Sequence, residues 1–327
     1  MGICRYCGQK ASWFSDVHDA CAISCRQGCE QVTSVVASTI KDKVNLPTGH
    51  PDTEGWYSEF ASQMWSDLQQ PVQKLTSEHR IPSDDLRNAL KEGWSTGSAT
   101  LALAEPLHPE KWEIVANLFK LMGFTQEDLL RTDGMAAALF SMVLWSVMVG
   151  DQPALFASMV QPHPFNLRDG EIQLCFLGSV VYSKETTNRS YQGGYGGMSV
   201  RLARGMYYHF GGFKGQRIDA STLTEVDYGG MLLTTQNIYF GGEHTNFRIP
   251  YEHVISFRPH SDGIGIFRDS ANAKAEVFRV LERNPNGGDP VNARPMFGWF
   301  LFNMAHFLAQ PEARTLYANG GRPRHPA

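Results

Sequence analysis

The chain of 327 residues is long enough for two or three domains, and its 42% hydrophobic and 19% charged residues are ordinary for a globular protein with a sizeable core. Its formal net charge of −4 at pH 7 excludes the chain-wide positive charge of a protein that coats nucleic acid. The charge is uneven, because residues 1–166 carry 12 Lys and Arg against 19 Asp and Glu, whereas residues 167–327 carry 17 against 14.

The sequence also bears on where the protein works. Residues 1–4 lack the apolar core of a signal peptide, and the most apolar stretch, residues 135–149, is too short to span a bilayer comfortably. Five of the six cysteines fall within residues 4–29, as in a metal site, and do not spread out as in a disulfide framework. We therefore expect a soluble protein of the cytoplasm.

The first chemical motif is Cys4-Arg5-Tyr6-Cys7-Gly8, in which two cysteines three positions apart precede a glycine. Two thiolates at this spacing can bind one ion, while the backbone N–H groups of the turn support the sulfurs and Gly8 permits the tight backbone. The motif is typical of a zinc knuckle, which needs two more ligands from a second segment.

Two ligand sets compete for the second half of this site. His18 and Cys21 complete a C-x2-C-x10-H-x2-C pattern with the first pair, and this set is preferred. Cys25 and Cys29 follow Cys21 at one-turn intervals on an expected helix, so Cys25 is the alternative fourth ligand. Either set surrounds Zn2+ with four protein ligands and predicts a structural zinc site. A cluster of free thiols is the remaining interpretation.

Helical patterns follow the cysteine-rich segment. Residues 22–44 place apolar side chains on one stripe, which predicts a helix. Residues 45–53 are rich in Pro and Gly and predict a linker. A further helix is expected before Pro71, with apolar residues at one-turn spacing, Phe60, Met64 and Leu68. Gly123 is placed to end a helix, and Thr125 and Asp128 are placed to cap the next one.

From about residue 167 the hydrophobic period changes to two, the period of a strand. About seven or eight short strands follow, with Gly or Pro at the turns, a pattern typical of an antiparallel barrel or sandwich. Residues 230–240 read as one of these strands, and Asp227 and Asp262 stand in segments with turn chemistry. Residues 296–308 predict an amphipathic helix, and a barrel followed by one such helix suggests pleckstrin-homology-like (PH-like) architecture.

These patterns together predict an α+β multidomain protein. It would hold a small N-terminal zinc ribbon, an all-helical middle block and an antiparallel PH-like β-barrel capped by a C-terminal helix. The expected divisions are residues 1–29 for the zinc ribbon, 30–53 for a helix and linker, 54–160 for the helical domain, 167–310 for the barrel with its helix and 311–327 for a frayed tail.

The sequence resembles a family of mostly uncharacterised bacterial proteins that combine an N-terminal zinc ribbon with a PH-like domain. The resemblance extends over nearly the whole chain and is carried by Cys4-x2-Cys7-Gly8, His18-x2-Cys21, Glu92-Gly93-Trp94, Arg189-Ser190-Tyr191, Phe247-Arg248-Ile249-Pro250-Tyr251 and Ser261-Asp262-Gly263. It favours His18 over Cys25 as a zinc ligand, and Cys25 and Cys29 look like additions in this member. It implies a fold and a domain order but no reaction.

A glycine-rich stretch, residues 189–197, lies between two expected strands. Its N–H groups are suited to an anion nest, and basic residues follow it, so an anionic lipid or a phosphate is a candidate ligand. The residues of this candidate site are Arg189, Tyr191, Gly193, Gly194, Arg201, Arg204, Lys214 and Arg217. The preferred interpretation is a hairpin turn with solvated basic side chains, and a protein-binding loop is the third. The spacing does not match a nucleotide P-loop.

In the strand region, no nucleophile, general base and orienting residue can be grouped by their spacing. The sequence therefore identifies no catalytic residues. We expect a non-enzymatic binding or adaptor protein with an unidentified protein partner. One alternative is nucleic-acid binding by the zinc ribbon, which the acidic residues Asp16, Asp19 and Glu30 weaken. The other is membrane association of the basic barrel face with anionic lipid.

Overall fold

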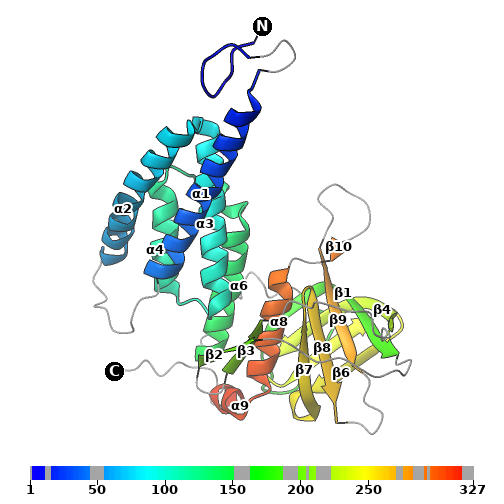
Figure 1. Cartoon of the computed structure of the whole chain (residues 1–327). Coiled ribbons are helices and arrows are strands. Elements are labelled where there is room, and N and C mark those ends of the chain that lie inside the picture. The colour runs from blue at the N-terminus through cyan, green and yellow to red at the C-terminus, as the bar shows by residue number, and fades with distance from the viewer. Residues whose placement is uncertain are drawn as a thin grey trace. The chain divides into compact units, whose positions relative to one another are not determined.

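The computed structural model describes residues 2–11, 16–44, 55–150, 163–186, 198–203, 206–210, 222–269, 275–282, 291–292 and 295–318. The chain divides into two compact units, Met1–Met142 and Val143–Ala327. The first unit is helical and the second contains an antiparallel sheet, so the predicted α+β class is confirmed (Figure 1). Among the described helices, none combines the length and the apolar character needed to cross a membrane. The linker predicted at residues 45–53 lies outside the described residues.

Helices account for most of the described chain up to Gly150. They are α1 (Asp19–Lys43), α2 (Trp56–His79), α3 (Ser83–Ala104), α4 (Pro109–Leu121), α5 (Gln126–Leu130) and α6 (Asp133–Val149). The helix predicted over residues 22–44 is confirmed as α1. Gly123 follows α4 with φ +85°, and Thr125 and Asp128 form the predicted capping box of α5. These two ends were predictable because caps depend on local backbone chemistry.

The end predicted for a helix at Pro71 is wrong, because α2 continues through this proline to His79. Proline removes one backbone donor from a helix and crowds the preceding turn. Tertiary packing offsets that cost here, since Leu68 before the proline and Val72 after it are both buried. The apolar stripe therefore continues on both sides of Pro71.

Helices α1 and α3 pack closely along their length. A Cβ atom at Gly93 would lie 2.8 Å from the carbonyl oxygen of Thr33, and one at Gly97 would lie 2.9 Å from the Cα of Ala37. Only glycine permits this approach of two backbones. Trp94, next to the first of these glycines, is fully buried and donates its indole N–H to the carbonyl of Val115 at 2.8 Å. The core of the helical unit is built on this seam.

The second unit is built on an antiparallel sheet in the order β6-β5-β4-β1-β9-β8-β7. These strands are β1 (Gln173–Thr186), β4 (Thr222–Thr234), β5 (Asn237–Gly242), β6 (Asn246–Pro250), β7 (Val254–His260), β8 (Gly263–Arg268) and β9 (Glu276–Glu282). Two further elements are β10 (Val291–Asn292), which pairs with β9, and a separate hairpin of β2 (Met198–Ala203) and β3 (Met206–Phe210).

The described strands do not close into the barrel predicted from the sequence. β6 and β7 stand at opposite edges of the strand order, although they are neighbours along the chain. The short 3-10 helix η1 (Tyr251–His253) connects them, so the chain passes from one edge to the other without pairing them. Strand periodicity predicts that strands form, but closure depends on which edges meet in space.

Two local predictions in the sheet are corrected by the structure. Residues 230–240 form a hairpin and not one strand, because Thr234 Oγ1 accepts the N–H groups of Gln236 and Asn237 and so turns the chain between β4 and β5. Asp227 lies inside β4 and not in a turn. It accepts backbone N–H groups from the loop between β5 and β6, at 2.9 Å from His244 and 2.7 Å from Thr245. The turn predicted at Asp262 is confirmed between β7 and β8.

The core of the sheet unit is aromatic and is covered by a helix. The rings of Tyr182, Phe240 and Phe278 lie with centroids 5.2–5.8 Å apart. The amphipathic helix predicted over residues 296–308 is confirmed as α8 (Pro295–Leu308), which packs against β7 and β8. A Cβ atom at Gly298 would lie 1.8 Å from the carbonyl oxygen of His260, so glycine is required at that approach.

The frayed tail predicted at residues 311–327 is wrong for its first part, which forms α9 (Pro311–Ala318). Ala313 and Tyr317 are buried, and the Tyr317 hydroxyl donates to the carbonyl of Val147 at 2.7 Å. A short amphipathic helix needs tertiary contacts of this kind, since its own hydrogen bonds do not hold it in water. Residues 319–327 lie outside the described residues.

Candidate metal centre

The first two candidate ligands are presented by a tight loop at the start of the chain. The N–H of Gly8 donates to the carbonyl of Cys4 at 2.8 Å, which closes a turn around Cys7. Gly8 has φ +69°, a left-handed conformation that glycine adopts readily, as expected for a tight turn at this position. A single β-bridge between Ile3 and Lys10 closes the wider loop. Cys4 and Cys7 therefore leave the backbone from one compact turn.

His18 is the residue immediately before α1 and has an extended backbone, with φ −84° and ψ 136°. Its carbonyl oxygen accepts the N–H groups of Cys21 and Ala22 and so begins the helix. Its Nε2 atom lies 3.0 Å from the carbonyl oxygen of Lys10. A carbonyl can only accept, so this contact places the imidazole proton on Nε2 and leaves the lone pair of Nδ1 free for a metal.

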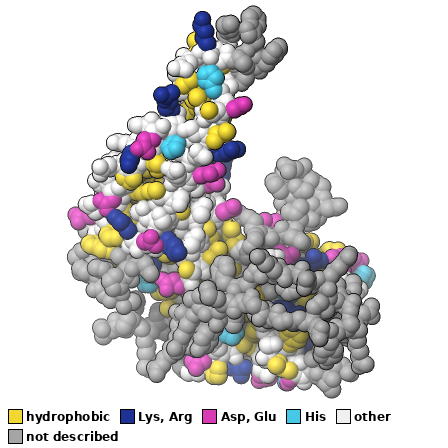
Figure 2. Space-filling view, in the orientation of Figure 1, with side chains coloured by type: hydrophobic (Ala, Val, Ile, Leu, Met, Phe, Trp, Pro, Cys, Tyr) yellow, Lys and Arg dark blue, Asp and Glu magenta, His cyan; other side chains and the backbone are white. Residues whose placement is uncertain are grey.

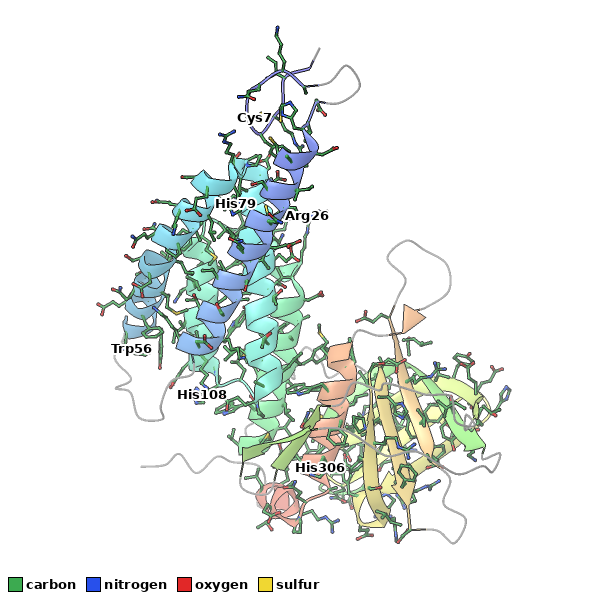
Figure 3. All side chains as sticks on the ribbon, viewed as in Figure 1. Cys7, Arg26, Trp56, His79, His108 and His306 are labelled. Carbon is green, nitrogen blue, oxygen red and sulfur yellow. The ribbon has the colours of Figure 1, made fainter. Side chains whose placement is uncertain are left out.

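The four residues of the preferred ligand set lie close together. Nδ1 of His18 is 3.3 Å from Sγ of Cys7 and 3.8 Å from Sγ of Cys21. With Sγ of Cys4, the ligand atoms all lie within 4.8 Å of one another, and they can hold a metal ion. Figure 3 labels Cys7 in the loop that precedes α1.

The electrostatics of the cluster favour a bound cation. Cys4 is 1% exposed, and burial alone would raise its pKa, but the backbone N–H groups of His18, Cys7 and Tyr6 lower it to about 6. Burial raises the pKa of Cys21 to about 11, with hydrogen bonding and repulsion from the other two sulfurs adding to the shift. The cluster thus stabilises one thiolate and disfavours a second. A bound divalent cation would offset the repulsion between the negative sulfurs.

Cys25, the alternative fourth ligand, is not gathered into this cluster. It lies one turn further along α1, is 3% exposed, and has its Sγ 3.8 Å from Oδ2 of Asp85 on α3. The Sγ of Cys29 lies 3.9 Å from the carbonyl oxygen of the same aspartate. Burial raises the pKa of both thiols, that of Cys29 to about 11. These two cysteines therefore belong to the packing between α1 and α3.

The candidate anion site in the second half of the chain falls almost entirely outside the described residues. This holds for Arg189, Tyr191, Gly193, Gly194, Arg204, Lys214 and Arg217. Only the backbone is described for Arg201, which pairs with Tyr207 in the β2–β3 hairpin. An anion site on these residues stays a prediction.

One contact of the metal centre had no signal in the sequence. Lys10 acts through its carbonyl oxygen, and a main-chain acceptor leaves no trace in the choice of side chain. A second contact joins the end of α2 to α1, where Nδ1 of His79 is 3.1 Å from Oγ of Ser24. The ring of that histidine rests on Gly28, where an added Cβ would lie 2.5 Å from the histidine Cβ. This histidine of α2 therefore packs against α1.

The charged surface of the helical unit is mixed in sign. Figure 2 shows Lys and Arg side chains interspersed with Asp and Glu over the visible face of this unit. Fold and site together define an α+β protein with a four-residue cluster of Cys and His at the start of a helical bundle. Comparison with known protein families, curated proteins and solved structures gave no match to this chain.

Proposed function

We propose that Cys4, Cys7, His18 and Cys21 hold a structural Zn2+ ion. Three sulfurs and one imidazole nitrogen are a donor set that zinc prefers. Tetrahedral bonds of about 2.0–2.3 Å place neighbouring ligand atoms about 3.5–3.8 Å apart. The separations of Nδ1 of His18 from two of the sulfurs, 3.3 Å and 3.8 Å, are close to that requirement. Four protein ligands leave no open position for a reacting water, which supports a structural role.

The ion would supply folding free energy that the segment lacks. Among the described residues before α1, only Cys4 and Ala11 are buried, so hydrophobic burial contributes little there. Small metal-binding modules with few buried apolar groups fold when the metal binds. The zinc ribbon would in this way be ordered against the N-terminus of α1.

Metal analysis of the purified full-length chain tests the zinc site. We expect one zinc per chain, loss of zinc in Cys7→Ser and retention in Cys25→Ser, which removes a thiol of α1 that lies outside the cluster. Replacement by Co2+ should give the visible absorption of a tetrahedral, sulfur-bound ion, which reports the ligands directly and does not depend on stability. Release of metal by Cys25→Ser together with retention by His18→Ala would show that the ligand set is wrong.

We further propose that the protein works by binding a protein partner and not by catalysis. The closed set of four metal ligands is the observation that carries this proposal. The buried carboxylates of the sheet unit support it, because they serve the fold: Glu171 accepts hydrogen bonds from Asn237 and Tyr239, and Glu276 accepts one from Tyr182. The sheet unit, with α8 over its core, would be a PH-like recognition module.

Cross-linking and affinity purification of the tagged full-length chain from its own cells test the binding role. We expect a protein that is enriched with the wild-type chain and depleted with Cys7→Ser, if the zinc ribbon forms part of the contact. Salt-dependent DNA binding by the purified chain, or flotation with anionic liposomes, would instead support the two alternatives. Absence of any partner in all three assays would contradict the proposal.

A further inference from the structure

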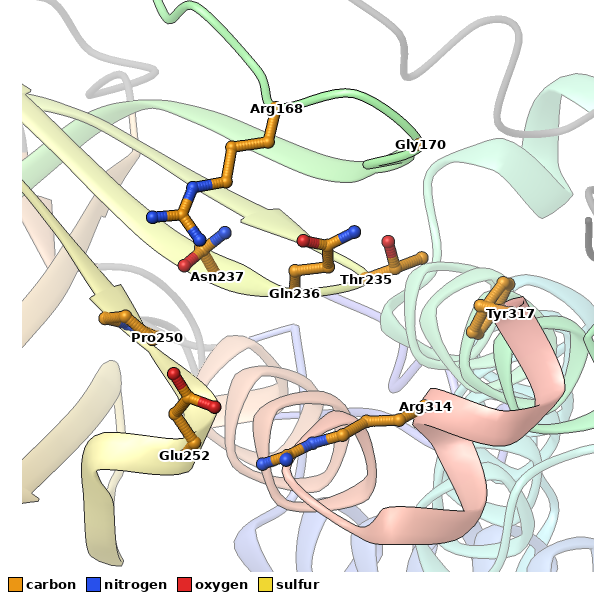
Figure 4. A pocket seen from close by; sticks show the side chains of 9 residues that line it. All are labelled: Arg168, Gly170, Thr235, Gln236, Asn237, Pro250, Glu252, Arg314 and Tyr317. Atoms are coloured by element: carbon orange, nitrogen blue, oxygen red, sulfur yellow. The ribbon is translucent and has the colours of Figure 1, made fainter.

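The second unit contains a pocket of about 300 Å³. Four segments that are distant in the sequence form its walls: the loop before β1, the turn between β4 and β5, the end of β6 with η1, and α9 (Figure 4). A pocket of this size suits a small metabolite. It does not involve the metal centre, which belongs to the first unit.

Two arginines face this pocket from different segments. Arg168 comes from the loop before β1 and Arg314 from α9, and Figure 4 shows both side chains among the pocket walls. Neither guanidinium has a hydrogen-bond or ion-pair partner within the described part of the chain, whereas Arg268 in the same unit pairs with Glu276. A guanidinium presents parallel N–H donors that match the two oxygens of a carboxylate. Two of them in one pocket therefore offer a binding site for an anion.

The nearest buried carboxylate does not neutralise these arginines. Glu171 accepts hydrogen bonds from the backbone N–H of Arg168, at 3.0 Å, and from the side chains of Thr234, Asn237 and Tyr239. Burial alone would raise the pKa of Glu171, but these four donors hold it below its usual value. The carboxylate is thus ionised and satisfied by neutral donors. The guanidinium groups stay available to a ligand.

The wall of the pocket also contains an acceptor without a donor. Asn237 is 1% exposed, and its Nδ2 donates to Oε1 of Glu171 at 2.8 Å, which fixes the orientation of the amide. Its Oδ1 atom is buried and has no hydrogen-bond partner among the described residues. Buried acceptors in proteins are nearly always satisfied, by the protein, by water or by a ligand. Because this oxygen has almost no solvent-accessible surface, a ligand in the open pocket does not reach it.

The remaining charged group of the pocket is acidic. Glu252, in η1, lines the same space, and its Oε1 lies 3.9 Å from Nε2 of His253. The pocket therefore offers two positive groups and one negative group. A ligand complementary to both must carry an anionic end and a cationic end.

We infer that this pocket binds a small amino carboxylic acid, with its carboxylate at one of the two arginines and its ammonium group at Glu252, which lies between them in Figure 4. The site thus gives the sheet unit a ligand class of its own, which goes beyond the proposed binding of a protein partner.

Ligand-observed NMR with the full-length chain tests this inference, with a mixture of the twenty standard amino acids as the probe. Acetate and methylammonium, which carry one charge each, are the comparison probes. We expect saturable binding of at least one amino acid and weaker binding of either comparison probe. Glu252→Gln and at least one of Arg168→Gln and Arg314→Gln should weaken that binding by about tenfold or more, since each removes a charge-assisted hydrogen bond. Unchanged affinity in Glu252→Gln, or in both arginine variants, would overturn the inference. All three residues are exposed, so the variants should fold.

The matched control is Arg248→Gln, which removes an exposed arginine from β6 outside the pocket. It should leave the affinity unchanged, and so should Cys7→Ser, because the pocket does not depend on the metal centre. Failure of all twenty amino acids to bind would overturn the inference. Binding of acetate as tight as that of the best amino acid, or an equal loss in Arg248→Gln, would also overturn it, by showing a general attraction of anions.

Discussion

The Nε2 atom of His18 lies 3.0 Å from the carbonyl oxygen of Lys10, and this contact helps to join the cysteine loop to the start of α1. It also selects the tautomer in which Nδ1 faces the three sulfurs. The side chain at position 10 takes no part in the contact. The geometry of the cluster therefore depends on the path of the main chain at Lys10 and not on the lysine side chain.

This relationship predicts different effects for the two residues. His18→Ala should weaken zinc binding by more than about tenfold, because a ligand is lost, whereas Lys10→Ala should leave it unchanged. His18→Cys should retain the ion, because it supplies a fourth sulfur. Competition with a colorimetric chelator measures all three affinities. If Lys10→Ala were as damaging as His18→Ala, the lysine side chain would have a role that the geometry does not provide.

The close packing of α1 on α3 predicts a steric cost at Gly93. Gly93→Ala would place a methyl group 2.8 Å from the carbonyl oxygen of Thr33, and a backbone atom in a helix cannot move aside easily. We expect a loss of about 1–3 kcal/mol in the free energy of unfolding. Thr96→Ala, on the exposed side of the same helix, should change it by less than about 0.5 kcal/mol. Urea denaturation of the two variants compares them, and equal stabilities would show that the helices can separate at no cost.

Acid should destabilise the helical unit partly through Asp128. Hydrogen bonds from Thr125, with help from Lys91, lower the pKa of this carboxyl group to about 2 in the folded protein, from a usual value of 3.8. A pKa that is lower in the folded state stabilises the protein above the unfolded pKa, and this contribution is lost as the pH falls through the folded pKa. The window is therefore about pH 4 to pH 2.

Asp128→Asn removes the titrating group and should flatten the pH dependence of stability in that window. The urea midpoint of the wild-type chain should fall more steeply from pH 4 to pH 2 than that of the variant. Glu127→Gln, at the neighbouring exposed position, is the control and should keep the wild-type slope. Identical slopes for the wild type and Asp128→Asn would contradict the assignment.

The ion pair between Arg268 and Glu276 predicts a coupled effect in the sheet unit. Glu276 is 5% exposed and also accepts a hydrogen bond from Tyr182 at 3.0 Å. Arg268→Leu leaves this buried carboxylate without its cation and should cost about 1–3 kcal/mol of unfolding free energy. The double variant Arg268→Leu/Glu276→Gln should recover part of the loss, since a neutral amide needs no counter-charge. Simple addition of the two single effects in denaturation experiments would show that the pair is not coupled.

The cluster of Cys and His and several helix ends were predictable from the sequence because they depend on local chemistry. Cys4, Cys7, His18 and Cys21 are close in the chain, and their spacing reports which side chains can meet at one ion. The capping box of Thr125 and Asp128 is equally local. The α+β class followed from the change of hydrophobic period near residue 167, since periodicity reflects the face that each element buries.

Features that depend on contacts distant in the chain were not predictable. Helix α2 continues through Pro71 because the bundle buries the apolar stripe of the helix both before and after this proline. Helix α9 forms because Tyr317 reaches Val147, and the sequence shows no sign of that partner. The pocket arginines, Arg168 and Arg314, are brought together only by the fold of the whole unit. Whether a sheet closes likewise depends on edges that the strands themselves do not specify.

Helix α1 fixes the position of Cys21, one residue of the cluster. The helix has 25 residues, so it is about 37 Å long, and it carries Cys21 in its first turn. About two turns further along, Gly28 packs against His79 of α2, so Cys21 stands on a helix that is packed against the bundle. Cys21 can therefore change its direction only if α1 moves as a whole against α3. A partner that contacts this end of α1 would therefore meet a surface with a fixed orientation. Little conformational freedom of the helix would be lost on binding.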